Sequence, residues 1–409
     1  MLGHSCFRET LTNFSQVRSP EKRYRRRTQH SSCQSAADVI EAEPHENTDG
    51  VLPSRLDVLS EAAAVVEPFP QQSPLQYLAD IALLQRENES LRTLVSEQEE
   101  QLKHHSSFTF AQIQSDNSKV SFFTGLPDKE TFRVLLDFLA RFPLHYHCEW
   151  RVGTLPLCEQ LLLTLMRLRL NVKVMHLATQ FNVSASTVCN VFVTIVSALH
   201  DILYKEIMEK NVPSVTQNRA CLPRSFAQFP NCRMVIDCTE IRIDQADSLK
   251  LRCATYSNYK SHTTFKSLIG IAPNGVVTYV SDLYGGSKSD KEIVQDCGIL
   301  SWVTPGDMLM ADKDFNIRNV LPSGVELNIP SFLYHGQFTK EEVVNNKKLS
   351  AARIHVERAI QRVKMFTILD HIPASLYKHA DKIFKVCACL TNFQTPIMAE
   401  VGANFSSLA

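Results

Sequence analysis

Three acidic residues stand at places in the sequence where folding could bring them together. Asp237 ends one short apolar run, and Asp312 ends another. Glu357 lies in the base-rich helical stretch Arg353–Lys364. Carboxylates carried by two strand ends and one helix can converge on a single point and bind hard divalent cations through oxygen. Because paired metals on either side of a scissile phosphate are a common solution to phosphodiester cleavage, these acids predict a metal-dependent nuclease site.

Each polar residue near these segments also has a simpler interpretation. An acid at a strand end is usually a solvated carboxylate. The prediction of a metal site therefore depends on the three acids together and not on any one of them. Glu240 is either a supporting group behind the metal ligands or a surface acid. Ser289 or Asp290 is expected to cap the following helix, and Asp290 is more readily a cap than a metal ligand. His355, on the same helix as Glu357, is expected to be a core residue.

Basic residues surround the acids and predict contacts with DNA phosphates. The candidates are Lys260, Lys266, Arg353, Arg358, Arg362 and Lys364. Arg353 precedes Glu357 by four residues, a helical spacing that would also let it orient that carboxylate. The alternative is that these bases form only a solvated face.

The distribution of charge along the chain is more informative than its sum. The 409 residues have room for two or three domains, and 43 Lys and Arg balance 43 Asp and Glu. Residues 38–67 are strongly acidic, whereas residues 345–385, around Glu357, are strongly basic. A neutral average therefore conceals a basic segment suited to nucleic acid.

The cysteines and the apolar runs exclude several classes of protein. The 12 cysteines include no C-x-x-C pair, so we predict neither a zinc site nor a disulfide framework. The N-terminus lacks the apolar core of a signal peptide. No run approaches about 18 uncharged apolar residues, so no contact with a membrane is expected.

The N-terminal part of the chain is predicted to lack structure. Residues 1–73 are polar and without hydrophobic periodicity, so we expect disorder there. Lys22–Arg27 is a basic cluster of the nuclear-localisation type, although it is also compatible with a plain charge run on a solvated tail. We therefore expect a nuclear protein and leave a cytoplasmic location open.

Residues 74–105 carry a heptad pattern. One set recurs every seven residues, and the second set is offset by three: Ile81, Asn88, Val95 and Leu102, then Tyr77, Leu84, Leu91 and Gln98. This pattern predicts a parallel coiled coil that begins at Pro74, joins two copies of the chain and has its register fixed by Asn88. The alternative is an amphipathic helix packed on its own domain.

Residues 120–210 are predicted to form an all-α domain that contains a helix-turn-helix. Val174–Phe181 and Ser184–Phe192 are the two helices, and Ser184 can cap the second one. The outward positions, where a recognition helix would meet the DNA groove, are Ser186, Thr187 and Asn190. The alternative is an ordinary helical bundle.

Residues 226–396 are predicted to form an α/β domain. The expected strands are 234–237 with a continuation to 243, then 264–272, 276–281, 307–311 and 324–329, with a tight turn at 273–275. The expected helices are 289–300, 340–366 with a break near Asn345 left open, and 376–393. Three antiparallel strands, a helix, a further strand and more helices describe an RNase H-like fold.

These segments resemble the PIF/Harbinger transposases, the DDE superfamily endonucleases. The matching pieces are Phe229–Ile241, Tyr256–His262, Gly285–Lys291, Gly306–Lys313 and His355–Arg358, and the likeness extends from about residue 120 to 395. It implies a catalytic triad of Asp237, Asp312 and Glu357 that binds Mg²⁺ or Mn²⁺ and acts on DNA. In the two-metal form Asp237 bridges both metals, and the other two acids complete one metal each.

The resemblance also concerns partners. Some members of the family need a separate Myb-like DNA-binding protein. Whether this chain also needs such a partner is left open by the sequence. Others carry an N-terminal zinc-dependent THAP domain, and its cysteine and histidine spacing is not found in this sequence.

One position departs from the family pattern. The family usually has glycine before the aromatic that follows the second acid, and here Asp314 precedes Phe315. If the position needs a positive φ, aspartate costs about 1 kcal/mol there. Asp314 is a tolerated change, an extra metal ligand, or a mark of lost activity. Two functions are therefore considered: an active transposase nuclease, and a domesticated DNA-binding nuclear protein with weak or no catalysis.

Overall fold

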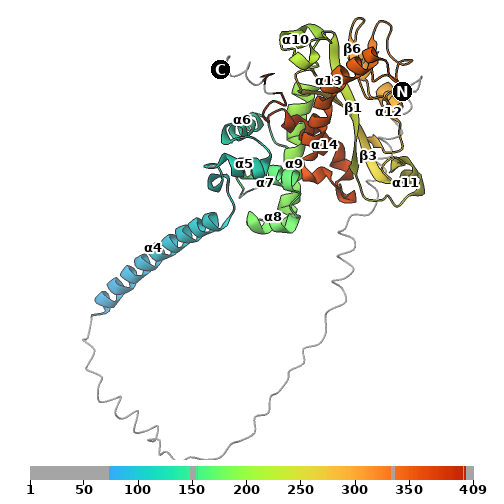
Figure 1. Cartoon of the computed structure of the whole chain (residues 1–409). Helices are drawn as coiled ribbons and strands as arrows, with labels where there is room; N and C mark the ends of the chain where they lie inside the picture. The colour runs from blue at the N-terminus through green and yellow to red at the C-terminus, as the bar shows by residue number, and fades with distance from the viewer. Residues whose placement is uncertain (1–72, 148–152, 154, 333–336, 399, 402–409) are drawn as a thin grey trace, which may run out of the picture. The chain divides into compact units, whose positions relative to one another are not determined.

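The computed structural model describes residues 73–147, 153, 155–332, 337–398 and 400–401 (Figure 1). The chain divides into two compact units, of which one is Arg18–Ser106 and the other contains Ser107–Ala409. Except for Ser73, the predicted disordered region and the basic cluster Lys22–Arg27 lie outside the described residues.

The first unit contributes one long helix, α4 (Pro74–Ser106). It begins at Pro74 as predicted, and the Ser73 amide donates to the Gln76 side chain just before it. The heptad positions from Tyr77 to Gln98 are exposed, and Leu84 and Leu91 are more than half accessible. The helix is therefore confirmed, and the coiled coil remains a prediction.

The second unit opens with helices. They are η2 (Phe110–Gln112), α5 (Asn117–Thr124), α6 (Lys129–Ala140), α7 (Leu157–Leu170), α8 (Val174–Gln180), α9 (Ala185–Leu199), the π-helix η4 (His200–Met208), α10 (Val215–Ala220) and η5 (Arg224–Phe226). Asp116 and Asp128 cap α5 and α6 by accepting from backbone amides in the first turn. α7 is buried over most of its surface, as its apolar sequence predicts.

The continuous run of α9 and η4 is the core helix of this part. Ala185–Met208 is long and apolar enough to cross a membrane, but most of it is buried inside the protein. Its apolar character is thus explained by contacts with other helices of the same chain.

A mixed sheet follows. Its strands are β1 (Cys232–Arg242), β2 (Tyr256–Ser257), β3 (His262–Ile271), β4 (Val277–Val280), β5 (Tyr284–Gly285), β6 (Met308–Met310) and β7 (Glu326–Asn328). β3 pairs antiparallel with β1, β2, β4 and β5, whereas β6 and β7 run parallel to β1 on its other side. Gly275, at φ +87°, closes the predicted turn between β3 and β4.

Helices cover both faces of the sheet. They are α11 (Leu249–Thr255), α12 (Asp290–Asp296), η6 (Ile299–Trp302), α13 (Lys340–Lys364), η7 (Thr367–Leu369), η8 (Ala374–His379) and α14 (Ala380–Thr391). α13 is unbroken through Asn345. Side chains alternate along β1, so Val235 joins the hydrophobic core with α13 and α14, while Met234 and Ile236 join the core of α12.

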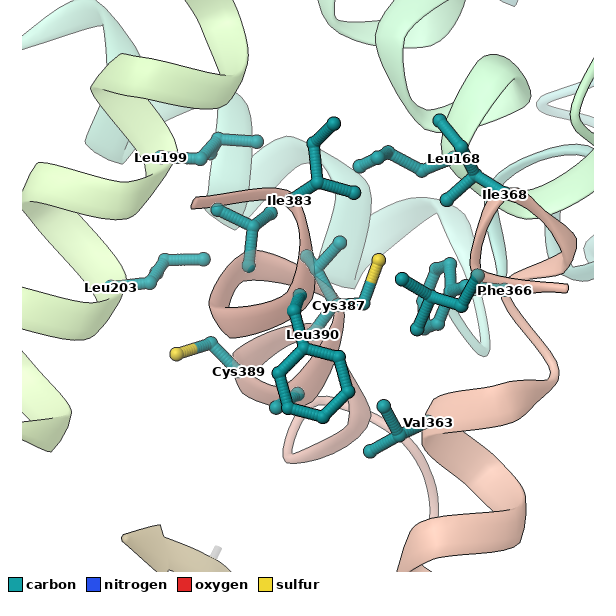
Figure 2. Close-up of a cluster of buried hydrophobic side chains, with 14 of the residues drawn as sticks. Leu168, Leu199, Leu203, Val363, Phe366, Ile368, Ile383, Cys387, Cys389 and Leu390 are labelled. Carbon is teal, nitrogen blue, oxygen red and sulfur yellow. The ribbon is translucent and has the colours of Figure 1, made fainter. Parts of the chain in front are cut away.

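One hydrophobic core connects the helical part to the α/β part. In Figure 2, α14 lies between Leu203 of η4 and Phe366. Phe366 stands two residues after the end of α13. Cys387 and Leu390 of α14 are fully buried in that cluster. The helix-turn-helix and the strands are therefore held against one common scaffold.

Candidate active site

The register of the two parallel strands brings Asp237 beside Asp312. Val235 of β1 pairs with Met310 of β6, and each aspartate lies two residues beyond its member of that pair. A step of two keeps a side chain on the same face of a sheet. Both aspartates therefore lie on the face that carries α13. β1 continues to Arg242, so Asp237 is inside a strand and not at its end, but it stands where its neighbour β6 ends.

α13 supplies Glu357 and connects it to Asp312 through Arg353. The Arg353 Nη2 atom lies 3.1 Å from Asp312 Oδ1 and 3.9 Å from Glu357 Oε1. Arg353 is only 9% exposed, whereas both acids are open to solvent. A single buried guanidinium thus compensates two acids that lie on different elements of the fold.

Backbone amides hold the two aspartates. The amide of Cys238 donates to Asp237 Oδ1 at 2.8 Å, and the amide of Lys313 donates to Asp312 Oδ1 at 2.6 Å. Burial raises the pKa of Asp237 to about 6, and the negative charge of Asp312 adds to the effect. Asp237 is therefore a carboxylate whose charge is costly in the folded protein and would be stabilised by a cation.

All three acids line one cleft of about 470 Å³. The other charged residues of its wall are Glu240, Lys260, Lys266, Asp290, Asp314 and Lys364. Acids and lysines thus border the same open space, an arrangement able to accept both cations and a phosphate backbone.

Three of the predicted phosphate contacts line this cleft. Lys260 comes from the β2–β3 connection and Lys364 from the end of α13. Lys266 forms an ion pair with Asp290 at 2.6 Å. Burial lowers the pKa of Lys266, but the hydrogen bond and charge of Asp290 outweigh it and raise the pKa overall. Lys260 and Lys364 are thus better placed for phosphates than Lys266.

The other three predicted contacts lie elsewhere. Arg353 is buried beneath the acids, which favours its predicted orienting role over a phosphate contact. Arg358 and Arg362 are absent from the cleft lining, and Arg362 donates to the backbone carbonyl of Thr395. Each residue turns a helix by about 100°, so Lys364 shares a face with Glu357 while Arg358 and Arg362 do not.

Glu240 and Asp290 have roles that their sequence context left open. Ser257 and Thr264 donate hydroxyl hydrogen bonds to the two Glu240 oxygens at 3.1 and 2.7 Å. A Cβ atom on Gly286 would lie 2.1 Å from the Thr264 hydroxyl, so only glycine fits there.

Of the two cap candidates, Ser289 is the cap of α12, because its hydroxyl accepts from the Glu292 amide. A cap role for Asp290 is therefore wrong: it is the first residue of that helix and forms an ion pair with Lys266.

Asp314 introduces no backbone strain. Among the non-glycine residues that the structure describes, only Asn171, Asn182 and Ser261 have positive φ. The position therefore does not need glycine, and Asp314 is an exposed residue on the cleft wall. The backbone cost considered from the sequence does not arise.

The helix-turn-helix consists of α8 and α9. Asn182, at φ 51°, makes the turn, and Ser184 caps α9 by accepting from the Thr187 amide at 3.1 Å. Ser186 is exposed and Asn190 partly so, as expected. Thr187 is only 7% exposed, so its predicted outward position is wrong: its hydroxyl lies 2.9 Å from the Ser184 hydroxyl and turns inward.

Two family descriptions match these regions. Residues 236–392 match the DDE superfamily endonucleases. This segment, which runs from β1 to the end of α14, is the part of the chain that is similar to a DDE endonuclease domain. Residues 153–205, which span α7, α8 and α9, match the helix-turn-helix of the same superfamily. No curated protein and no solved structure matches the chain.

The metal chemistry of the DDE endonuclease domain can be compared with its residues. The superfamily is generally dependent on divalent metals. In the described ranges, no three His, Cys, Asp or Glu side chains are gathered as a metal site. The donor set nevertheless fits, because Asp237, Asp312 and Glu357 offer carboxylate oxygens to one cleft and burial leaves the Asp237 charge in need of a cation.

Proposed function

We propose that this protein is a metal-dependent DNA endonuclease and transposase of the PIF/Harbinger type. The observation that carries the proposal is the cleft that Asp237, Asp312 and Glu357 line together within the matched endonuclease domain. An RNase H-like assignment is supported by the strand order β4–β3–β1–β6–β7, with three antiparallel strands followed by two parallel ones.

The three acids would hold Mg²⁺ or Mn²⁺. The metals would supply Lewis acidity, which lowers the pKa of an attacking water and neutralises charge on the phosphate oxygens. The chain's own residues prepare the site. Arg353 holds Asp312 and Glu357 toward each other, and the backbone amides after Asp237 and Asp312 fix the two aspartates. Lys260 and Lys364 would receive the DNA backbone at the cleft wall.

DNA recognition is assigned to the helix-turn-helix and dimerisation to α4. Ser186 and Asn190 are the accessible polar residues at the start of α9, where a recognition helix contacts base edges. The exposed heptad positions of α4 would be covered by the same helix of a second copy. We further propose a nuclear location, on the basis of the basic cluster Lys22–Arg27. A separate Myb-like protein is the candidate for an additional DNA-binding partner.

Nicking of supercoiled plasmid DNA by the full chain tests the proposed activity. Cleavage should require Mg²⁺ or Mn²⁺, stop with a chelator, and leave 3′-hydroxyl ends. DNA that carries candidate terminal inverted repeats should then be cut at its ends. DNA binding without cleavage in either metal would contradict the nuclease and would favour the DNA-binding alternative.

A matched variant separates the site from contamination by another nuclease. Glu357→Gln removes one proposed ligand, whereas Glu341→Gln makes the same change at an exposed position in the first turn of the same helix. Only Glu357→Gln should abolish nicking. Equal activity of the two variants would show that the cleavage comes from elsewhere.

A further inference from the structure

The connection between β2 and β3 presents an aromatic ring at the cleft. Tyr259 is 84% exposed, which is unusual for so large an apolar surface, and it lines the same cleft as the three acids. Tyr256, three residues earlier, is 45% exposed and is absent from that lining. Of these two tyrosines, only Tyr259 therefore lies at the candidate active site.

The backbone that carries Tyr259 is tied to the sheet. The Lys260 amide donates to the Ser257 hydroxyl at 3.2 Å, and that hydroxyl donates to Glu240 Oε1 at 3.1 Å. Ser261, at φ 57°, completes the tight connection. Glu240 itself lines the cleft, so the hairpin formed by β2 and β3 is connected to the cleft wall by hydrogen bonds. The ring is thus presented by a braced backbone.

The charge beside the ring identifies a suitable ligand. Lys260 Nζ lies 4.6 Å from the centroid of the Tyr259 ring, a cation–π contact. Lys364 adds a second cation to the same cleft. An aromatic face next to cations is the combination that proteins use to bind unpaired nucleotides, by stacking on the base and attracting its phosphate. Bases inside a duplex are already stacked on each other, so their faces are closed to such a ring.

We propose that Tyr259 stacks on an unpaired nucleobase of the DNA strand held in the cleft. The inference rests on the proposed DNA-cutting function and adds that the substrate is bound with a nucleotide out of its duplex near the acids. Lys260 receives the adjoining phosphate. Glu240, through Ser257, positions the hairpin and does not contact the base.

Fluorescence and binding measurements without divalent metal test this subsite. The full chain is mixed with a fully paired duplex, or with the same duplex ending in an unpaired 2-aminopurine. Stacking on Tyr259 should quench the 2-aminopurine. Tyr259→Ala should abolish the quenching and weaken binding of the unpaired DNA about 5- to 150-fold, the range that stacking on one base provides. Tyr259→Phe should retain both properties.

Controls distinguish this inference from the proposed function. Tyr256→Ala should behave as the unchanged protein. Tyr259→Ala should lose less affinity for the fully paired duplex, in which a base must first be unstacked, than for the unpaired DNA. Normal quenching by Tyr259→Ala, or an equal loss for both DNAs, would overturn the stacking while leaving the nuclease proposal intact. If the unchanged protein binds neither DNA, both proposals are wrong.

Discussion

The guanidinium of Arg353 lies 3.1 Å from the carboxylate of Asp312, and thereby joins α13 to the end of β6. The same nitrogen reaches Glu357 at 3.9 Å. Arg353 therefore supplies, within the protein, part of the positive charge that a metal would supply between these acids. This relationship leads to the first prediction.

Arg353→Ala should destabilise the metal-free protein and make it more responsive to metal. Removing a buried partner leaves two acids facing each other, so the free energy of unfolding should fall by about 1–3 kcal/mol in chemical denaturation. Mg²⁺ or Mn²⁺ should then raise the melting temperature of this variant more than that of the unchanged protein. Arg358→Ala, on the exposed side of α13, is the control. Equal metal-induced shifts in all three proteins would contradict the shared role.

Asp237→Asn should stabilise the metal-free protein at neutral pH. The pKa of Asp237 is about 6 in the folded protein, above its ordinary value of 3.8. Between pH 3.8 and 6 the folded state therefore binds more protons than the unfolded state. Stability contributed by this group is therefore present at low pH and lost as the pH rises through 6. The variant should gain about 1–3 kcal/mol in free energy of unfolding at pH 7, and the gain should vanish near pH 4. A pH-independent difference between the two proteins would refute this origin.

The same pKa gives a pH dependence for metal binding. Asp237 must lose its proton to bind a cation, so affinity for Mn²⁺ should fall as the pH drops below about 6, with proton release on binding. Calorimetry in buffers of different ionisation enthalpy measures both effects. Asp314→Asn, an exposed position in the same cleft, should leave them unchanged. Loss of metal binding in that variant would instead make Asp314 a ligand.

Substitutions at the start of α9 should affect either the stability of the fold or DNA binding, depending on which way the side chain points. Ser184→Ala and Thr187→Ala should each lower the free energy of unfolding, by about 1 kcal/mol for the cap residue Ser184. Ser186→Ala and Asn190→Ala should leave the melting temperature unchanged and weaken DNA binding in a gel-shift assay. DNA affinity that is insensitive to both outward residues would argue against α9 as the recognition helix.

Neighbouring leucines in α4 test dimerisation. Leu84 belongs to the heptad seam, whereas Leu83 does not, and both are more than half exposed. Leu84→Glu should convert the protein to a monomer in sedimentation velocity, because a charge in the seam is unpaired and desolvated. Leu83→Glu should remain dimeric. A monomer in the unchanged protein at the same concentration would rule out the proposed role of α4.

Local patterns in the sequence predict the strands and helices that carry the acids. Met234–Ile236 and the residues before Asp312 are short continuous apolar runs, a signal of a buried strand that depends only on neighbouring residues. The two-residue strands β2 and β5 are too short to give such a signal. The pairing of Val235 with Met310, which aligns the two aspartates, is a long-range choice that no local pattern states.

The errors at the site have physical causes as well. The positions of Val188 and Phe192 predict an outward Thr187, but its hydroxyl forms a hydrogen bond with the Ser184 hydroxyl and turns inward. The many bases of the segment predict that Arg362 lies beside Glu357, whereas the helical phase places the two side chains on different faces. Pairing of Arg353 with Asp312 depends on the sheet, and so could be found only from the fold.

The most direct test of the central claim is the single-turnover DNA cleavage rate of the triad variants. Asp237→Asn, Asp312→Asn and Glu357→Gln should each lose cleavage in Mg²⁺ and Mn²⁺, with Glu341→Gln as the unaffected control. Residues that act as one unit are non-additive, so the double variant of Asp237 and Glu357 should be no slower than the slower single variant. Cleavage that survives any one of these three changes would contradict a common metal site.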